Sequence, residues 1–196
     1  MLLCLRLHPG PPPDNRSPPP EAGDDPPGLV GPLGRIGGWC QAEDGAGFFA
    51  LSLWRRENSD APDDPQHARW HCLQDVGGIY DALPTALLSA NSLSLIEREV
   101  DADDRVPVIK AQRRDVNPLL ARQPGFLAGA FAGSPPSPDR FLELGLWQDF
   151  DSARQFLGGL EAFDAPLRIA SASLQRTRAL CLPILRRYTR ERPDGD

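Results

Sequence analysis

The sequence is poor in lysine, histidine and methionine. Lys110 is the only lysine among 21 basic residues, and 27 acidic residues leave a net charge of −6. Outside a group of arginines between positions 176 and 192, no basic stripe is present, so we expect no nucleic-acid partner. We interpret those arginines as a solvated strand face and a charged chain end.

Metal and redox motifs are also lacking. The four cysteines are Cys4, Cys40, Cys72 and Cys181. They include no Cys-x-x-Cys pair, so we interpret them as ordinary buried thiols. His67 and His71 are four positions apart, a spacing that puts two ligands on one face of a helix. Because further ligands are not specified, a solvated helix face is the favoured interpretation, and no metal or cofactor is expected.

Long apolar runs are missing as well. No segment could span a membrane, and residues 1–7 are too short and lack the basic start of a signal peptide. We therefore expect a cytoplasmic protein with reduced cysteines and no membrane partner. The chain also lacks a nucleophile beside a base, a phosphate-binding glycine loop and a dinucleotide fingerprint, which excludes the sharpest enzyme signatures.

Proline and glycine are abundant instead, with 22 and 18 copies. The prolines gather at residues 9–27, which predicts a disordered arm. Beyond the arm, two segments echo one another: Phe-Phe-Ala-Leu-Ser-Leu-Trp at 48–54 and Phe-Leu-Glu-Leu-Gly-Leu-Trp at 141–147. Each follows a Pro-Gly turn and a glycine-rich run. The matched order predicts an internal repeat.

The second copy has the clearer pattern. It predicts strands at 92–100, 127–132, 141–148 and within 174–188, a helix starting near Pro107 after an Asp103 or Asp104 cap, and a helix capped by Asp151 or Ser152. Phe156, Leu157, Leu160 and Phe163 would face inward on the second helix. This β-α-β-β-α-β order is the ferredoxin-like signature.

The predicted fold class is therefore α+β, with tandem ferredoxin-like repeats forming a pseudo-dimeric α+β barrel. The expected divisions are an arm at 1–27 that can include a first strand at 1–7, a first repeat at 28–91, a second at 92–190 and a tail at 191–196. The first repeat is degenerate, because its crossover helix would fall between residues 7 and 26, where the prolines forbid it. Since each sheet would need its twin to cover an aromatic face, we expect a monomer with an internal pseudo-dimer.

Alternation along the strands predicts which side chains line a cavity between the sheets. The leucines at 142, 144 and 146 are expected to lie under the helices. The opposite faces would line the cavity; they carry Phe48, Ser52 and Trp54 in the first copy and Phe141, Glu143, Gly145 and Trp147 in the second. Aromatic ends with small residues between them suit a small apolar or aromatic ligand.

Glu143 is the one carboxylate on the proposed cavity face, and two interpretations of it remain open. As a catalytic residue, together with Trp147, it would act as a general base in an apolar setting. Alternatively, it is a structural strand glutamate at the rim that pairs with an arginine such as Arg98. The tryptophans are in the first place core residues.

The stretch Pro-Gly-Phe-Leu-Ala-Gly at 124–129, followed by the 141–147 strand and a helix, resembles the antibiotic biosynthesis monooxygenase group of dimeric α+β barrels. Gly-Arg-Ile-Gly-Gly-Trp at 34–39 with the 48–54 strand is similar to an uncharacterised bacterial tandem branch of that superfamily. The resemblance implies a barrel with a ligand cavity and, in some members, oxidation of aromatic substrates by oxygen without a cofactor.

Other members of that group degrade haem with an asparagine, a tryptophan and a histidine. Trp147 matches the tryptophan, but the second copy has no histidine and its first strand has no asparagine, so haem chemistry is not expected. The alternative function is a non-catalytic ligand-binding or interaction protein that has kept the barrel.

Overall fold

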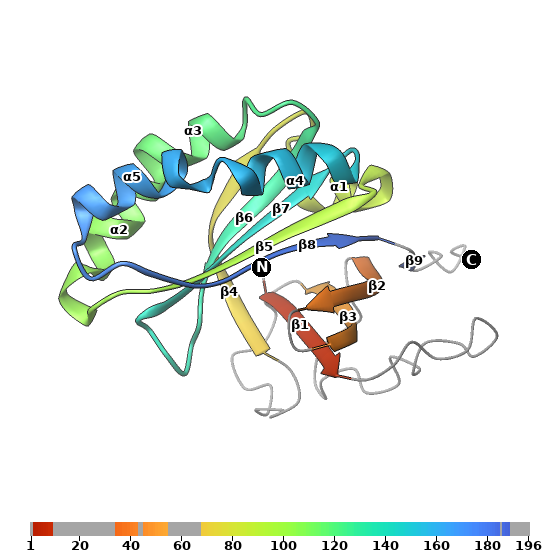
Figure 1. Cartoon of the computed structure of the whole chain (residues 1–196), viewed down its shortest axis with the longest axis horizontal. Coiled ribbons are helices and arrows are strands. Elements are labelled where there is room, and N and C mark those ends of the chain that lie inside the picture. The colour runs from red at the N-terminus through yellow and green to blue at the C-terminus, as the bar shows by residue number, and fades with distance from the viewer. Residues whose placement is uncertain (1, 10–33, 43–44, 55–67, 185, 189–196) are drawn as a thin grey trace, which may run out of the picture.

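The computed structural model describes residues 2–9, 34–42, 45–54, 68–184 and 186–188. Within them, nine antiparallel strands form one sheet in the order β8-β5-β7-β6-β4-β1-β3-β2-β9 (Figure 1). The strands of the N-terminal half are β1 (Leu2–Pro9), β2 (Gly34–Ala42), β3 (Gly45–Trp54) and β4 (Ala68–Gly77). Those of the C-terminal half are β5 (Ser92–Glu99), β6 (Phe126–Gly133), β7 (Arg140–Trp147) and β8 (Gln175–Pro183), followed by β9 (Arg186–Tyr188).

The two halves of the sheet are joined at both ends. β4 pairs with β6, with His71 opposite Gly133. At the other end β9 pairs with β2, with Ile36 opposite Arg187. Because β9 follows β8 closely in the chain and β8 also contacts β2, the last stretch of polypeptide bridges the two edges of the sheet. The sheet therefore curls back toward itself.

Helices cover one face of the C-terminal strands (Figure 1). The connection between β5 and β6 consists of a short η1 turn (Ala102–Asp104), α2 (Arg105–Ala111), a π-helical turn η2 (Gln112–Val116) and α3 (Asn117–Leu120). The connection between β7 and β8 consists of α4 (Phe150–Gly158) and α5 (Leu160–Ala170). A separate short helix, α1 (Leu83–Ser89), follows β4. The C-terminal half is thus an antiparallel sheet with helices in the ferredoxin-like arrangement.

The sheet separates two hydrophobic clusters, and their composition corrects the predicted faces. The leucines at 142, 144 and 146 pack with Leu3, Leu51 and α1 on the inner side of the curled sheet. Phe141 and Trp147 lie on the opposite side, against Phe156, Phe163 and the other helix residues. The prediction had these faces reversed. Both faces of β7 are buried, so its sequence has no polar face that would show which side the helices cover.

Most predicted elements of the second copy are confirmed, with differences at their ends. Asp149, rather than Asp151 or Ser152, caps α4, and its Oδ1 accepts a 2.7 Å hydrogen bond from the Ser152 amide. The long second helix is divided at Gly159, where weak helix propensity ends one segment before the next begins. Leu157 is half-buried rather than fully inward.

Only part of the predicted first copy can be compared with the structure. The strand at 48–54 and the first strand at 1–7 are present within β3 and β1. The arm was predicted to begin at residue 9, but Pro9 is the last residue of β1. Residues 10–27, where no crossover helix was expected, lie outside the described residues. None of the described helices is long and apolar enough to cross a membrane.

Candidate functional site

An aromatic layer fills the interface between the sheet and the helices. It consists of Phe126, Phe131, Phe141, Trp147, Phe156 and Phe163. Phe131 and Phe141 stack with 5.0 Å between ring centroids, and Trp147 lies 4.9 Å from Phe156 and 5.2 Å from Phe126. Edge-to-face and offset contacts of this kind fix ring orientation beyond simple burial. The layer provides a rigid apolar wall.

Trp147 is held in this layer through its indole nitrogen. Trp147 Nε1 donates a 2.8 Å hydrogen bond to Ser94 Oγ, and both residues are buried. Gly145 pairs directly with Ser94 across the strands, and a Cβ at this position would lie 2.6 Å from Ser94 Oγ and 2.8 Å from Trp147 Nε1. The space that the small residue was predicted to leave for a ligand is therefore occupied by the tryptophan and the serine.

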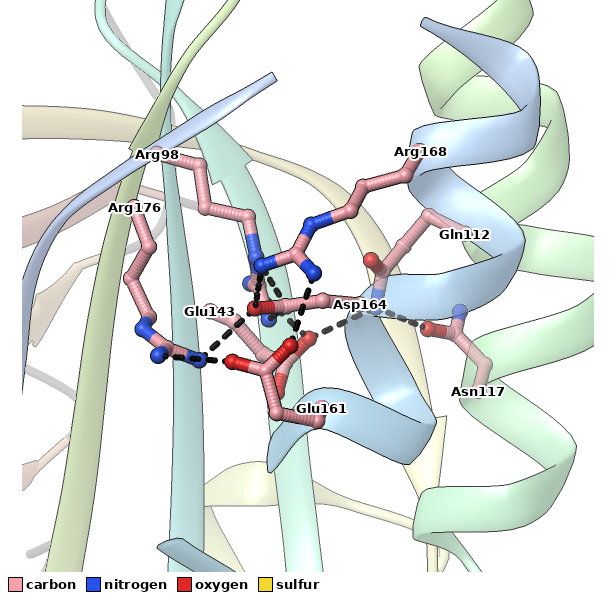
Figure 2. Close-up of polar contacts among 8 residues, drawn as sticks. All are labelled: Arg98, Gln112, Asn117, Glu143, Glu161, Asp164, Arg168 and Arg176. Carbon is pink, nitrogen blue, oxygen red and sulfur yellow. Dashed lines mark hydrogen bonds and ion pairs between the residues drawn. The ribbon is translucent and has the colours of Figure 1, made fainter. Parts of the chain in front are cut away.

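Beside the aromatic layer, three charged side chains form a buried ion cluster (Figure 2). Arg98 of β5 donates to Asp164 Oδ1 of α5 from Nε at 3.1 Å and Nη2 at 2.8 Å. Its Nη1 donates to Glu143 Oε2 of β7 at 3.4 Å. Each of the three side chains is 1% exposed. Because an unpaired charge is very costly at such depth, each group depends on the others.

A β-bulge extends the cluster to the surface. The pairing of β5 with β8 shifts register between Glu97 and Arg98, which leaves Thr177 as an extra residue. As a result Arg176 donates to Asp164 Oδ2 at 2.7 Å on the helix side, whereas Arg178 contacts Glu97 on the inner side. Bulges of this kind re-aim side chains next to functional sites.

At the surface, Glu161 of α5 completes the network (Figure 2). It accepts hydrogen bonds from Arg168 at 2.7 Å and from Arg176 at 3.2 Å. The bond from Arg168, followed by that residue's charge, lowers the pKa of Glu161 below its usual range. Water reaches this outer pair, so it contributes less stability than the buried cluster.

Deeper in the sheet–helix interface, a chain of amides continues from Glu143. Gln112 Nε2 donates to Glu143 Oε2 and to Asn117 Oδ1, each at 2.9 Å. Asn117 Nδ2 donates to Gln74 Oε1 at 2.8 Å, and Gln74 Nε2 to the Ile109 carbonyl at 2.8 Å. The network thus crosses the whole sheet–helix interface from β4 to α5.

Two local irregularities bring the amides to this place. Gln112 opens the π-helical turn, and Pro118, which follows that turn, has no amide hydrogen with which to continue a regular ladder. In β4 the register shifts between Cys72 and Gln74. Cys72 therefore packs on the inner cluster while Gln74, two positions later, faces the helices.

Two oxygen atoms of the network have no hydrogen-bond partner among the described residues. They are Gln112 Oε1 and Glu143 Oε1. Both residues are at most 1% exposed, and they are already joined through Gln112 Nε2 and Glu143 Oε2. A buried acceptor without a donor costs about 1–3 kcal/mol. These two atoms can therefore accept hydrogen bonds from a ligand that carries donors.

The predicted site residues of β7 do come together. Phe141, Glu143, Gly145 and Trp147 share one buried face, although that face lies under the helices rather than between two sheets. Glu143 pairs with Arg98, which confirms that part of the structural interpretation, but the pair is deeply buried and not at a rim. Phe48, Ser52 and Trp54 belong to β3; their side chains lie outside the described residues, so their role stays a prediction.

The remaining sequence candidates give no site. His71 lies in strand β4, so the helical face predicted for His67 and His71 is wrong, and His67 lies outside the described residues. Cys72 and Cys181 are half-buried rather than fully buried. Among the residues that the structure describes, no group of histidine, cysteine and acidic side chains is placed to hold a metal ion.

Sequence reasoning missed Asp164, Gln112, Asn117 and Gln74. Asp164 offered a signal, because it lies four positions after Leu160 and three before Leu167, on the apolar face of α5. A charged residue at such a position needs a buried partner. The three amide side chains offered no comparable signal. A π-helical turn places Gln112 and a register shift places Gln74, and neither irregularity is visible in the sequence pattern.

Comparisons with known proteins agree with this fold. Neither protein-family models nor curated proteins give a match. A proposed monooxygenase from Fusobacterium nucleatum matches with a TM-score of 0.59 at 9% identity, over 96% of this chain and 94% of its own. An anthrone oxidase-like protein matches with a TM-score of 0.59 at 10% identity, over 95% and 92%. A second proposed monooxygenase, from Lactobacillus acidophilus, gives 0.54 at 11%, over 85% and 83%.

These likenesses establish the fold. The chain shares its α+β fold with two proposed monooxygenases and an anthrone oxidase-like protein. At such low identity the fold alone assigns no reaction.

Proposed function

We propose that the protein binds a small hydroxylated aromatic compound between the sheet and the helices and oxidises it with molecular oxygen, without a bound cofactor. The observation that carries the proposal is the pair of unpaired acceptors, Gln112 Oε1 and Glu143 Oε1, beside the wall of aromatic rings. A phenolic ring fits both features: its face packs on the rings and its hydroxyl donates to an acceptor.

Each nearby residue has a role in this proposal. Glu143 Oε1 accepts a proton from the substrate, while Arg98 and Gln112 hold the other carboxylate oxygen. Trp147, fixed by Ser94, and Phe141 position the ring of the guest. Glu143 and Trp147 would be the catalytic residues.

The chemistry balances with oxygen as the sole co-reactant. For an anthrone-type methylene, Glu143 removes one C–H proton and the carbanion adds to O₂, forming a C–O bond. The peroxide takes that proton back from Glu143 and becomes a hydroperoxide. Loss of the second C–H proton to Glu143 then breaks the O–O bond, giving the carbonyl and hydroxide, which takes the proton from Glu143 and leaves as water.

The similar structures support the direction of this proposal. One is described as anthrone oxidase-like and two as proposed monooxygenases, and those descriptions belong to those proteins. The fold they share with this chain is compatible with the same reaction class here.

A second candidate is a binding protein without catalysis. One observation favours it: Glu143 is engaged by Arg98 and Gln112 within a network that includes Asp164 and reaches the surface, as structural ion networks are. Such a protein would bind the same hydroxylated ring and release it unchanged.

Oxygen uptake separates the two. The full chain is incubated with anthrone and a panel of hydroxylated anthrones, and oxygen consumption and quinone formation are followed. We expect turnover that falls about 100-fold or more in Glu143→Gln, because the base is lost while the shape is kept. The control is Glu97→Gln, since Glu97 is another strand carboxylate that is paired with arginine, but it lies on the inner side of the sheet.

Each outcome has a distinct meaning. Ligand-induced stabilisation without oxygen uptake would leave the binding function and reject the oxidation. Equal turnover in both variants would reject Glu143 as the base. Neither uptake nor stabilisation across the panel would reject both functions.

We also propose that the chain is a tandem of two ferredoxin-like copies, at 28–91 with strand 1–7 and at 92–190, paired as an internal pseudo-dimer. Support comes from equal strand orders, β4-β1-β3-β2 and β8-β5-β7-β6, and from the edge pairing of the halves. Light scattering at micromolar concentration tests it. A mass near 21.4 kDa is expected, and a stable mass of twice that value would contradict the internal pair.

A further inference from the structure

The inner side of the sheet contains a second polar group at one end of its leucine cluster. Arg140 of β7 donates to Glu97 Oε2 of β5 at 2.8 Å, and Arg178 of β8 donates to Glu97 Oε1 at 3.2 Å. Arg140 and Arg178 are 39% and 45% exposed, so this end is open to water. The buried Trp70 of β4 lies beside it, with its ring centroid 5.8 Å from the Arg140 guanidinium carbon.

Two donors in this group lack a hydrogen-bond acceptor among the described residues. They are Trp70 Nε1 and Arg140 Nε. Trp70 is 2% exposed, so water does not reach its indole from outside. Arg140 Nε lies 3.2 Å from Glu99 Oε1 as an ion pair, but without hydrogen-bond geometry. A buried indole N–H normally has a partner, and leaving it without one is unfavourable.

The polarity here is opposite to that of the site under the helices. That site presents unpaired acceptors, whereas this one presents unpaired donors. The charges are also balanced, with Arg140 and Arg178 against Glu97 and Glu99. The carboxylates of Glu97 and Glu99 would repel an anionic ligand, so a neutral ligand with a hydrogen-bond acceptor fits better. The adjoining inner cluster, which includes Leu95 and Leu142, suits an apolar body.

We propose that this end of the inner cluster binds a small neutral molecule with a carbonyl oxygen on an apolar body, distinct from the guest of the sheet–helix interface. The carbonyl oxygen accepts hydrogen bonds from Trp70 Nε1 and Arg140 Nε. Its apolar part packs on the ring of Trp70 and on the neighbouring leucines. A carbonyl carries no donor and therefore gains nothing from Glu143 Oε1 or Gln112 Oε1.

The test compares acetophenone with ethylbenzene, which has nearly the same shape but no acceptor. The full chain is titrated with each compound, by calorimetry and by following indole N–H resonances in ¹⁵N-labelled protein. The Trp70 resonance is assigned by its loss in Trp70→Phe. We expect acetophenone to bind about tenfold more tightly than ethylbenzene and to shift the Trp70 resonance.

Three variants locate the effect. Trp70→Phe removes the indole donor and Arg140→Lys removes Nε while keeping the charge beside Glu97, so each should abolish the preference for acetophenone. Arg140→Lys leaves the core untouched and covers the case in which Trp70→Phe folds poorly. Glu143→Gln should keep the preference, because it lies on the other side of the sheet. An unmoved Trp70 resonance at millimolar acetophenone, or an equal response to ethylbenzene, would overturn the proposal.

Discussion

Replacing Asp164 by alanine tests whether the buried ion cluster holds the helices on the sheet. Asp164 Oδ1 accepts two hydrogen bonds from Arg98, and Oδ2 accepts one from Arg176. Without the carboxylate, the Arg98 guanidinium, which is 1% exposed in the native chain, has a single ion-pair contact left, to Glu143 at 3.4 Å. Removing one partner of such a buried cluster costs about 3–5 kcal/mol.

The matched control is Glu161→Ala on the same helix. Glu161 also binds two arginines, but it is 67% exposed, so its loss should change the stability little. A triple variant, Arg98→Met with Glu143→Leu and Asp164→Leu, removes all three charges together. It should recover most of the lost stability, because replacing a whole buried cluster by apolar groups is often neutral or better.

Urea denaturation followed by far-ultraviolet circular dichroism measures these differences. The midpoint should fall strongly for Asp164→Ala and little for Glu161→Ala, with unchanged slopes. If the two single variants lose the same stability, or if the triple variant is less stable than Asp164→Ala, the cluster does not act as the buried, mutually dependent unit described above.

Three further predictions concern other positions. Gly145→Ala should cost about 1–3 kcal/mol in urea denaturation, because its methyl group meets Ser94 and Trp147, whereas Gly77→Ala, with open space around it, should change stability little. Burial, together with Asp75, raises the pKa of Cys72 to about 12. Iodoacetamide at pH 8 should therefore label this thiol about 1000-fold more slowly in the folded than in the unfolded chain, which peptide mass analysis would measure. The Ser152 amide lowers the pKa of Asp149, so this cap stabilises the fold above the unfolded pKa of about 3.9; Asp149→Ala should cost about 1 kcal/mol at pH 7, and the gap should close as the pH falls through the folded pKa.

The strands of the C-terminal half were predictable because their patterns are regular. β5 and β7 pair in register over their whole length, from Ser92 opposite Trp147 to Glu99 opposite Arg140. The runs of apolar residues, and the Gly/Pro turns at their ends, therefore predict where these strands begin and end. β4 was not predicted as a strand, since the shift between Cys72 and Gln74 breaks its period of two.

The site could be predicted only in part, for a related reason. Glu143 and Trp147 were identified because alternation within β7 places them together. The partners that give Glu143 its surroundings come from separate elements: Arg98 from β5, Gln112 from a π-helical turn and Asp164 from α5. Local pattern does not encode such long-range contacts, although the pattern of charges along α5 would have shown an acid on its apolar face.

The bridging of the two sheet edges by β8 and β9 has a consequence for synthesis. β2 leaves the ribosome early, but its outer partner, β9, lies roughly 150 positions later in the chain. Until β9 has been synthesised, the backbone amides and carbonyls along that side of β2 have no strand to pair with, and an exposed strand edge invites pairing with another chain. The nascent chain would then be most vulnerable to aggregation before β9 has been made, and a variant that lacks β9 should leave the same side of β2 unpaired.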